Sequence, residues 1–200
     1  MLLIIQNGTI EISINKYLDY EYRVVKSFDT DVSNIDPTEY DAIIILGGHQ
    51  SVTMLSSYPY LINVVELIKK CIDKNIPTLG ICLGCQLIAY AIGCDIKSCD
   101  KLNIDYDTSI MGFDNIFRCH IDYTVPNDKI KVLEYVDNMP YLFVHNKCIY
   151  GIQSHPDISP ESVVKFSNCP DTIAYAKKHS ESIDKNNRIV INKLLEIMLN

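Results

Sequence analysis

Two runs of apolar residues in the first quarter of the chain contain no polar alternation. Leu2–Gln6 and Ala42–Leu46 are apolar at nearly every position, with Tyr22–Val25 between them as a weaker strand-like run. A strand that is apolar on both sides is buried on both faces, which is typical of a parallel sheet covered by helices. The pattern therefore predicts the first strands of such a sheet.

Other apolar residues recur at helical spacing. Ile10, Ile14, Tyr17 and Leu18 predict a helix after the first strand, and 60–71 carries an apolar stripe with charged residues outside it. Further helices are predicted to open at Gly84 and close near Gly93, to start at Ser159-Pro160-Glu161, and to span Ile189–Leu199. Strands alternating with helices predict an α/β fold, a flavodoxin-like and mainly parallel sheet with helices on both faces.

The pattern changes after about Cys94. Short strand-like runs follow one another with turns between them and predict a small antiparallel β annex beside the main sheet. These runs are Asn115–Tyr123, Ile130–Val136, Tyr141–Val144 and Cys148–Gln153. Because no linker or repeat interrupts the chain, we expect residues 1–200 to form one domain.

The stretch from Pro77 to Tyr90 carries candidate chemistry. Leu79 and Ile81 predict a short strand, and Gly80 and Gly84 flank Cys82. Residues without a Cβ allow a strand to turn abruptly into a helix, as in the nucleophile elbow of hydrolases. Such a turn would present the Cys82 sulfur at the carboxyl end of the strand, beside a helix N-terminus that favours a thiolate.

Composition and charge exclude several classes of protein. The 200 residues are 48% hydrophobic and 22% charged, with a net charge of −7. No block of lysine or arginine suggests a nucleic acid or an anionic membrane as partner. No apolar run approaches the ~18 residues that span a bilayer. Eight cysteines in a chain of this size are expected to be reduced thiols, which indicates a cytoplasmic location.

Other interpretations of the cysteines stay open from the residues alone. Cys82 could be an inert core thiol, or it could pair with Cys85 as a redox C-x-x-C motif or a silencing disulfide. Cys82, Cys85, Cys94 and Cys99 could also bind zinc, but the gap and the helix between the two pairs fit such a site poorly. We therefore expect no metal.

Three segments, each after a predicted strand, together resemble the class I (triad-type) glutamine amidotransferases. They are Gly47-Gly48-His49-Gln50-Ser51, Gly80-Ile81-Cys82-Leu83-Gly84-Cys85-Gln86 and Gln153-Ser154-His155-Pro156-Asp157. Within that family the amidotransferase part of GMP synthetase looks most similar. Its Ser-His-x-Asp segment has a variant here in Cys119-His120-Ile121-Asp122.

The resemblance implies a role for each matching residue. Cys82 would be the nucleophile, His155 the general base and acid, and Asp157 the residue that orients the imidazole. Asp157 stands where the family has a glutamate and is one methylene shorter. His49 and Ser154 also depart from common family residues, a proline and an aromatic residue.

The resemblance also implies a substrate site and a reaction. The backbone N–H groups of Gly48 and Leu83 would form the oxyanion hole beside Gly47, and Gln86 would help to hold L-glutamine. A γ-glutamyl thioester would form and be hydrolysed, releasing ammonia without any cofactor. Because the sequence has no nucleotide-binding loop, use of the ammonia would need a synthetase partner in trans. The alternative is a catalytically idle relative that binds or regulates.

Overall fold

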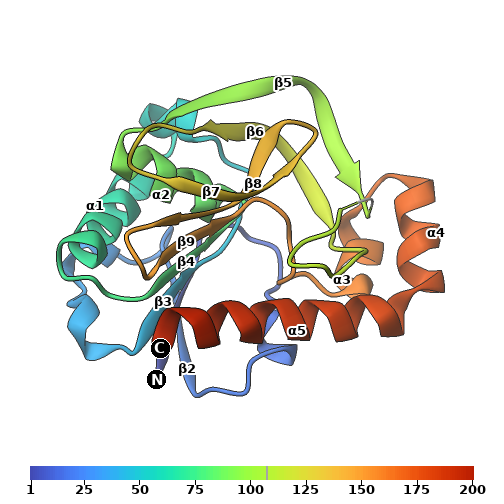
Figure 1. Cartoon of the computed structure of the whole chain (residues 1–200), viewed down its shortest axis with the longest axis horizontal. Helices are drawn as coiled ribbons and strands as arrows, with labels where there is room; N and C mark the ends of the chain where they lie inside the picture. The colour runs from blue at the N-terminus through green and yellow to red at the C-terminus, as the bar shows by residue number, and fades with distance from the viewer. Residues whose placement is uncertain (107) are drawn as a thin grey trace.

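The computed structural model describes residues 1–106 and 108–200, and its centre is a mixed β-sheet (Figure 1). Among these residues seven strands form the sheet in the order β2-β1-β3-β4-β9-β8-β7. Neighbouring strands from β2 to β9 run parallel, and β8 and β7 continue the sheet antiparallel. The parallel part has the flavodoxin-like strand order, so the predicted fold class is confirmed. The strands are β1 (Leu2–Gln6), β2 (Tyr22–Lys26), β3 (Ala42–Ile45), β4 (Thr78–Ile81), β7 (Lys131–Val136), β8 (Met139–His145) and β9 (Ile149–Ile152).

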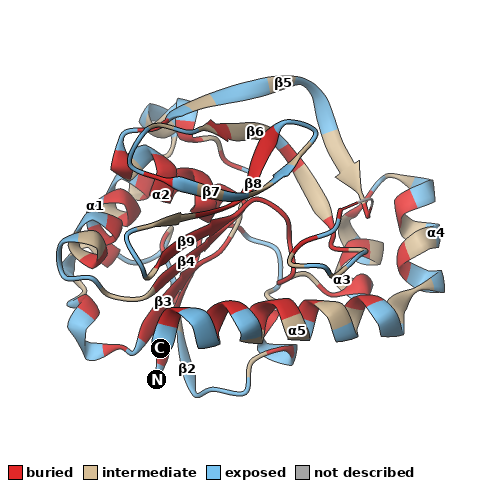
Figure 2. Ribbon diagram, viewed as in Figure 1, coloured by how far each residue is buried: buried red, intermediate tan, exposed pale blue. Residues whose placement is uncertain are grey.

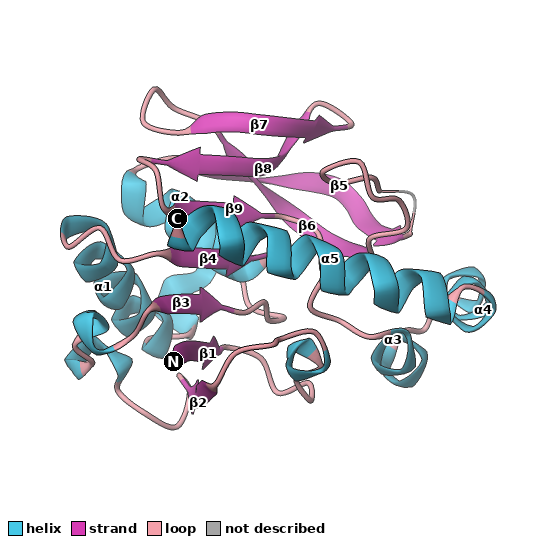
Figure 3. Cartoon of the chain, turned by 60° about the horizontal axis from the view of Figure 1, so that its bottom comes forward, coloured by secondary structure: helices cyan, strands magenta, loops and turns pink. Residues whose placement is uncertain are grey.

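Helices cover both faces of this sheet, as Figures 2 and 3 show. On β1, Leu3 and Ile5 pack into one core cluster with α1 (Tyr60–Asp73) and α2 (Leu83–Ile92). Leu2 and Ile4 point to the opposite face and pack with α5 (Ser180–Leu199). Successive residues of a strand face opposite sides, so two helical layers require an apolar residue at every position. This explains the unbroken apolar runs in the sequence.

The antiparallel annex is built differently from the prediction. It consists of β5 (Asp95–Asp105) and β6 (Arg118–Val125), which form a separate antiparallel pair. The run 148–153, predicted to lie in the annex, instead forms β9 and pairs parallel with β4. All four residues of β9 are buried, as in a central strand. The sequence pattern did not indicate β5, because a strand whose two faces are largely open to water is mostly polar and lacks an apolar periodicity.

The helix predicted after β1 is absent from the described residues. Only a single 3-10 turn forms there, at Ile14–Lys16. The reason lies in tertiary contacts of the segment: Gln6 Nε2 donates to the carbonyl oxygens of Gly8 and Ile10, and Ser13 bonds to distant residues at the site. These bonds hold the connection as a loop that borders a cavity.

The remaining helices lie on the C-terminal half of the chain. They are α3 (Pro160–Phe166) and α4 (Pro170–Lys178). In the N-terminal half, short 3-10 turns occur at Val32–Asn34, Pro37–Glu39 and Val52–Ser57. Ser159 caps α3 as predicted, its hydroxyl accepting from the amide of Ser162. The last helix starts at Ser180 rather than at the predicted Ile189. In the part of the chain that the structure describes, no helix has the length and apolar content to span a bilayer.

Candidate active site

The turn between β4 and α2 has the strained geometry that its glycines predict. Cys82 has φ +52° and ψ −107°, a conformation that residues with a side chain rarely adopt. A Cβ on Gly84 would lie 2.0 Å from the carbonyl oxygen of Ile45, and one on Gly80 would lie 2.4 Å from that of Gly84. Only glycines therefore allow α2 to start so close to β3 and β4. The expected strand–turn–helix elbow is confirmed.

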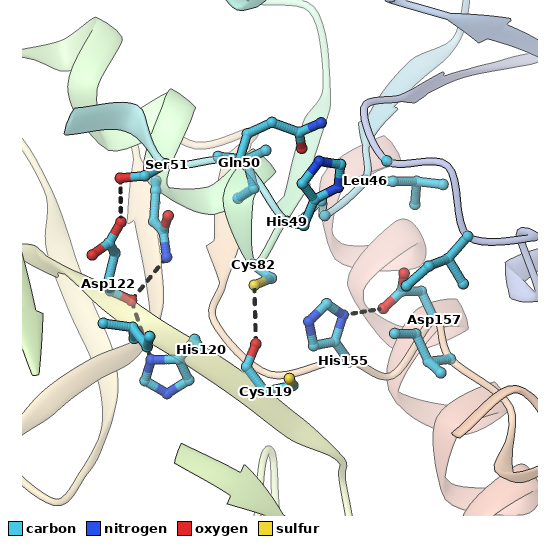
Figure 4. Close-up of a pocket in the computed structure, with 18 of the residues that line it drawn as sticks. Leu46, His49, Gln50, Ser51, Cys82, Cys119, His120, Asp122, His155 and Asp157 are labelled. Atoms are coloured by element: carbon cyan, nitrogen blue, oxygen red, sulfur yellow. Dashed lines mark hydrogen bonds and ion pairs between the residues drawn. The ribbon is translucent and has the colours of Figure 1, made fainter. Parts of the chain in front are cut away.

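The Cys82 thiol lies at the floor of a cavity and is 5% exposed as a residue. It donates to the carbonyl oxygen of Cys119 over 3.7 Å (Figure 4). Gln153 Nε2 approaches the sulfur at the same distance. An amide N–H directed at sulfur stabilises a thiolate more than a thiol. The role of Gln153 was not predicted, although it begins the segment Gln153–Asp157 that the sequence singled out.

The imidazole of His155 lies between Cys82 and Asp157 (Figure 4). Its Nδ1 is 3.0 Å from Asp157 Oδ1, and the two residues are 6% and 7% exposed. The backbone fixes this segment: the His155 amide donates to the Phe117 carbonyl at 2.7 Å, and Ser13 Oγ donates to the Asp157 carbonyl at 3.1 Å. The shorter aspartate thus reaches the imidazole where the family has a glutamate.

Three influences set the pKa of His155. Burial is the largest and lowers the pKa, because a charged imidazole loses hydration. The negative charges of Cys82 and Asp157 act in the opposite direction, and together they raise the pKa of His155 well above its usual value. The site therefore favours a charged imidazolium next to Cys82, the arrangement that activates a cysteine nucleophile.

The loop after β3 lies against the side chains of Cys82 and His155. A Cβ on Gly47 would lie 2.9 Å from His155 Cε1 and 3.4 Å from the Cβ of Cys82, so only a glycine fits between the two. Gly48 packs against Leu83 in the same way, its added Cβ being 3.1 Å from Leu83 Cδ2. Leu83 is the first residue of α2, and the amide of such a residue has no partner inside its helix. The predicted substrate-binding residues therefore all line the cavity that Cys82 borders.

One side of the cavity, which we call the polar wall, consists of Ser51, Gln86, Ser98, His120 and Asp122. Asp122 joins its members: its carboxylate accepts from Ser51 Oγ and from Ser98 Oγ, and its carbonyl oxygen accepts from Gln86 Nε2 at 2.8 Å. The Gln86 amide nitrogen is thus bonded to β6, a contact the sequence could not indicate. Figure 4 shows Ser51, His120 and Asp122 together on one side of Cys82.

His120 is held neutral within this wall. Its Nδ1 donates to the Asp122 carbonyl at 3.1 Å, so its Nε2 accepts from the Tyr141 hydroxyl. Burial is the largest influence and lowers the pKa of His120 to about 4. The hydrogen bond to the Asp122 carbonyl is the next largest and opposes it, whereas the positive charges of His155 and Arg118 act with burial. The resemblance of 119–122 to the Ser-His-x-Asp segment was the only sequence signal for these residues.

The opposite side of the cavity, which we call the apolar wall, consists of Ile10, Ile12, Leu46, Ile158 and Phe166. Met54, Leu102 and Ile121 add further apolar surface to the lining of the cavity. Ile158 follows Asp157 in the chain, Ile12 precedes the Ser13 that binds it, and Leu46 lies on the same side of Cys82 in Figure 4. Phe166 contacts Phe117 edge-on, and Phe117 in turn contacts the His155 ring. The whole cavity has a volume of about 550 Å³, the size of a site for a small molecule.

The structure does not gather Cys82, Cys85, Cys94 and Cys99 into one site. All eight cysteines are free. Cys85, on α2, and Cys94, just after it, pack into the core cluster with α1, whereas Cys99 lies in the annex against Met139. Among the described residues no three histidine, cysteine, aspartate or glutamate side chains gather as a metal site would require. The redox-pair and zinc interpretations have no support in this arrangement.

Comparisons with known proteins agree with this architecture. A computed match to the glutamine amidotransferase class-I family model covers residues 4–192. The glutamine amidotransferase-like protein L716 of Acanthamoeba polyphaga mimivirus is 55% identical over 198 residues, covering 99% of this chain and 97% of that protein. A solved structure of a glutamine amidotransferase from Thermotoga maritima has the same fold, with a TM-score of 0.79 at 20% identity over 100% of this chain and 97% of that one.

A more distant relative is a larger protein. GMP synthase (glutamine-hydrolyzing) of Clostridium novyi (strain NT) is 30% identical over 152 residues, which cover 68% of this chain. The aligned region amounts to only 28% of that protein's length. The relationship is therefore to one part of the synthase. On the family match and on this sequence identity, the chain belongs to the class I glutamine amidotransferase family.

Proposed function

We propose that this chain hydrolyses the side-chain amide of L-glutamine, with Cys82 as nucleophile, His155 as general base and acid, and Asp157 as the residue that orients His155. The observation that carries the proposal is a thiol on a strained elbow beside a buried imidazole whose other nitrogen faces a carboxylate at 3.0 Å. Nucleophile, base and orienting group in that order are the parts that acyl transfer requires.

The reaction proceeds in two steps. The Cys82 sulfur attacks the amide carbon of glutamine, and the developing oxyanion is stabilised by the amides of Gly48 and Leu83. The C–N bond then breaks as His155 gives its proton to the departing ammonia, leaving a γ-glutamyl thioester. In the second step water loses a proton to His155, attacks the thioester and releases glutamate, which restores the thiolate–imidazolium pair.

The polar wall supports an orientation for the substrate. The Asp122 carboxylate and the hydroxyls of Ser51 and Ser98 match an α-ammonium group, which needs acceptors. Gln86 acts by tying β6 to α2 through its bond to Asp122, so its contribution is to the shape of the site. The amino-acid end of glutamine then lies at the polar wall and the amide at Cys82.

The ammonia is proposed to serve a synthetase chain in trans. The chain aligns with one part of a GMP synthase, 28% of its length, and in this proposal the ammonia-accepting step is assigned to another chain. A GMP synthase-like role in purine synthesis would require a separate chain that accepts ammonia.

Glutamine hydrolysis is tested by measuring glutamate release from L-glutamine, together with covalent labelling by 6-diazo-5-oxo-norleucine. We expect labelling of Cys82 alone, and loss of both labelling and hydrolysis in Cys82→Ala. The matched control is Cys148→Ala, because Cys148 is a half-buried thiol on the opposite end of β4 and β9. Absence of labelling and of hydrolysis in the wild-type chain, alone and with candidate synthetases, would contradict the proposal and favour the binding or regulatory alternative.

A further inference from the structure

The segment at the start of β6 contacts both Cys82 and His155 through its backbone. The carbonyl oxygen of Phe117 accepts from the His155 amide at 2.7 Å. The carbonyl oxygen of Cys119 accepts from the Cys82 thiol at 3.7 Å (Figure 4). Arg118 lies between Phe117 and Cys119 in the chain. A shift of the backbone at Arg118 would therefore move the acceptors of His155 and Cys82 together.

Backbone pairing does not tie β6 into the main sheet. In the described part of the chain β6 forms a ladder with β5, and these two strands are a sheet of their own. A two-stranded pair is at best marginally stable by itself. Side chains that reach from β6 to the main sheet must therefore fix the position of the strand over the cavity.

Arg118 makes such a connection. Its Nε donates to Asp105 Oδ1 at 2.7 Å, and its Nη1 donates to Asp137 Oδ2 at 2.7 Å. Asp105 is the last residue of β5 and lies opposite Arg118 in the ladder, whereas Asp137 lies in the turn between β7 and β8. The guanidinium also interacts with the hydroxyl of Tyr141 in β8. One side chain thus joins the annex to the antiparallel edge of the main sheet.

The connection leads back to the site through the main sheet. Asp137 and Asn138 have φ +50° and +62°, the backbone conformation of a tight two-residue hairpin turn. After this turn β8 pairs with β9, and β9 leads into the segment that carries His155. The bond between Arg118 and Asp137 therefore holds β6 against the hairpin whose second strand lies beside the strand that positions the imidazole.

Exposure indicates what these ion pairs contribute. The Arg118 side chain is 11% exposed, whereas the side chains of Asp105 and Asp137 are 37% and 63% exposed. Ion pairs with well-exposed carboxylates contribute little to the free energy of unfolding. A guanidinium, however, directs its planar set of donors at two carboxylates in fixed directions, which an ammonium group does not do. The contribution of Arg118 is therefore to geometry more than to stability.

We propose that Arg118 is a positioning residue for glutamine hydrolysis, which holds the backbone of β6 against His155 and Cys82; the inference rests on the proposed function. Arg118 is not among the described residues that line the cavity, so it acts through its neighbours in β6. The polar wall has its own hydrogen bonds, centred on Asp122. Loss of Arg118 therefore affects the reacting groups more than the binding of the amino-acid end of the substrate.

The test measures kcat and KM for glutamate release from L-glutamine in the wild type and four variants. Arg118→Gln removes both ion pairs, and Arg118→Lys keeps the positive charge without the planar set of donors. Asp137→Gly removes only the connection to the turn, at a position where φ is +50° and suits glycine. The matched control is Arg23→Gln, which removes an exposed arginine from β2, at the opposite edge of the sheet from β7.

The expected result is a loss of kcat without a comparable change in KM. Arg118→Gln should lower kcat about ten-fold or more, because a small misplacement of reacting groups is costly, and should change KM by less than about two-fold. Arg118→Lys should recover only part of this loss. Asp137→Gly should lower kcat about three-fold or more, and Arg23→Gln should change neither constant. A urea titration of each variant shows whether it is folded.

The outcomes separate this inference from the proposed function. An unchanged kcat in Arg118→Gln, full recovery in Arg118→Lys, or a rise in KM alone would overturn the inference while wild-type hydrolysis still supports the proposed function. If Arg118→Gln does not fold, Asp137→Gly decides, and an unchanged kcat in that variant overturns the inference. If the wild-type chain releases no glutamate and 6-diazo-5-oxo-norleucine does not label Cys82, the proposed function fails and the inference fails with it.

Discussion

The contact between His155 and Asp157 can be tested by replacing the Asp157 carboxylate with an amide of the same size. Asp157→Asn keeps the size of the side chain and an oxygen that accepts from Nδ1, but removes the negative charge. Both residues are less than a tenth exposed, so little water screens that charge. The other charge that raises the pKa of His155 comes from Cys82 and is unaffected by this change.

The expected size of the effect follows from the geometry. For two unit charges 3.0 Å apart, Coulomb's law gives roughly 5 kcal/mol at an effective dielectric constant of about 20. At 1.36 kcal/mol per pH unit this corresponds to a ceiling of about 4 units. A neighbouring opposite charge usually shifts a pKa by about 1–3 units. We therefore expect Asp157→Asn to lower the pKa of His155 by about 1–3 units.

The assay is a pH titration of the His155 Cε1–H signal by NMR, with the signal assigned from its loss in His155→Gln. The matched control is Asp128→Asn, which removes one exposed carboxylate in the turn before β7 and should not move the His155 midpoint. A change in midpoint of less than about half a unit in Asp157→Asn would refute the argument that this carboxylate stabilises the imidazolium.

Stability gives an independent check with a defined sign. A histidine whose pKa is raised by folding contributes stability that is complete below its unfolded pKa of about 6.5. This contribution is lost as pH rises through the native pKa. Asp157→Asn lowers the native pKa, so the difference in unfolding free energy between wild type and variant should be largest at low pH and shrink as pH rises.

Two further predictions concern the elbow and the polar wall. In a urea titration, Gly84→Ala should destabilise the protein by about 3 kcal/mol or more, because its Cβ would overlap the Ile45 carbonyl. The control is Gly112→Ala, where a Cβ meets open space but φ is +79°. This change should cost only about 1–2 kcal/mol. His120→Gln should make stability less sensitive to acid. The pKa of His120 is lowered to about 4, so on going from pH 7 to pH 4.5 wild type should lose about 2–3 kcal/mol more than the variant. Equal losses in the two proteins would contradict a neutral buried His120.

The elbow could be predicted in detail because its determinants are adjacent in the sequence. Gly80, Cys82 and Gly84 lie within five residues, and the need for glycine arises where one strand passes directly into one helix. The unbroken apolar runs of β1 and β3 likewise depend only on each strand having two covered faces. Local sequence therefore determined the first strands of the parallel sheet and the elbow that presents Cys82.

The helix predicted from Ile10 to Leu18 shows where local reasoning ends. Ile14 and Tyr17 are buried as the pattern requires, but Gln6 and Ser13 bond the segment to its own loop and to Asp157. Side-chain bonds of this kind compete with helix formation. Their partners are as far away as 144 positions, so helical spacing alone cannot reveal them.

By itself, the sequence determined which chemical groups are present and which of them end a buried strand: a cysteine between glycines, and a histidine followed two residues later by an aspartate. Only the tertiary structure decided that β9 lies beside β4, which places His155 next to Cys82, and that β6 closes one side of the cavity while the loop after β1 lines the other. The physical reason is that burial pattern and turn chemistry act between neighbours in the chain, whereas the two walls of the cavity are made by contacts between residues far apart in it.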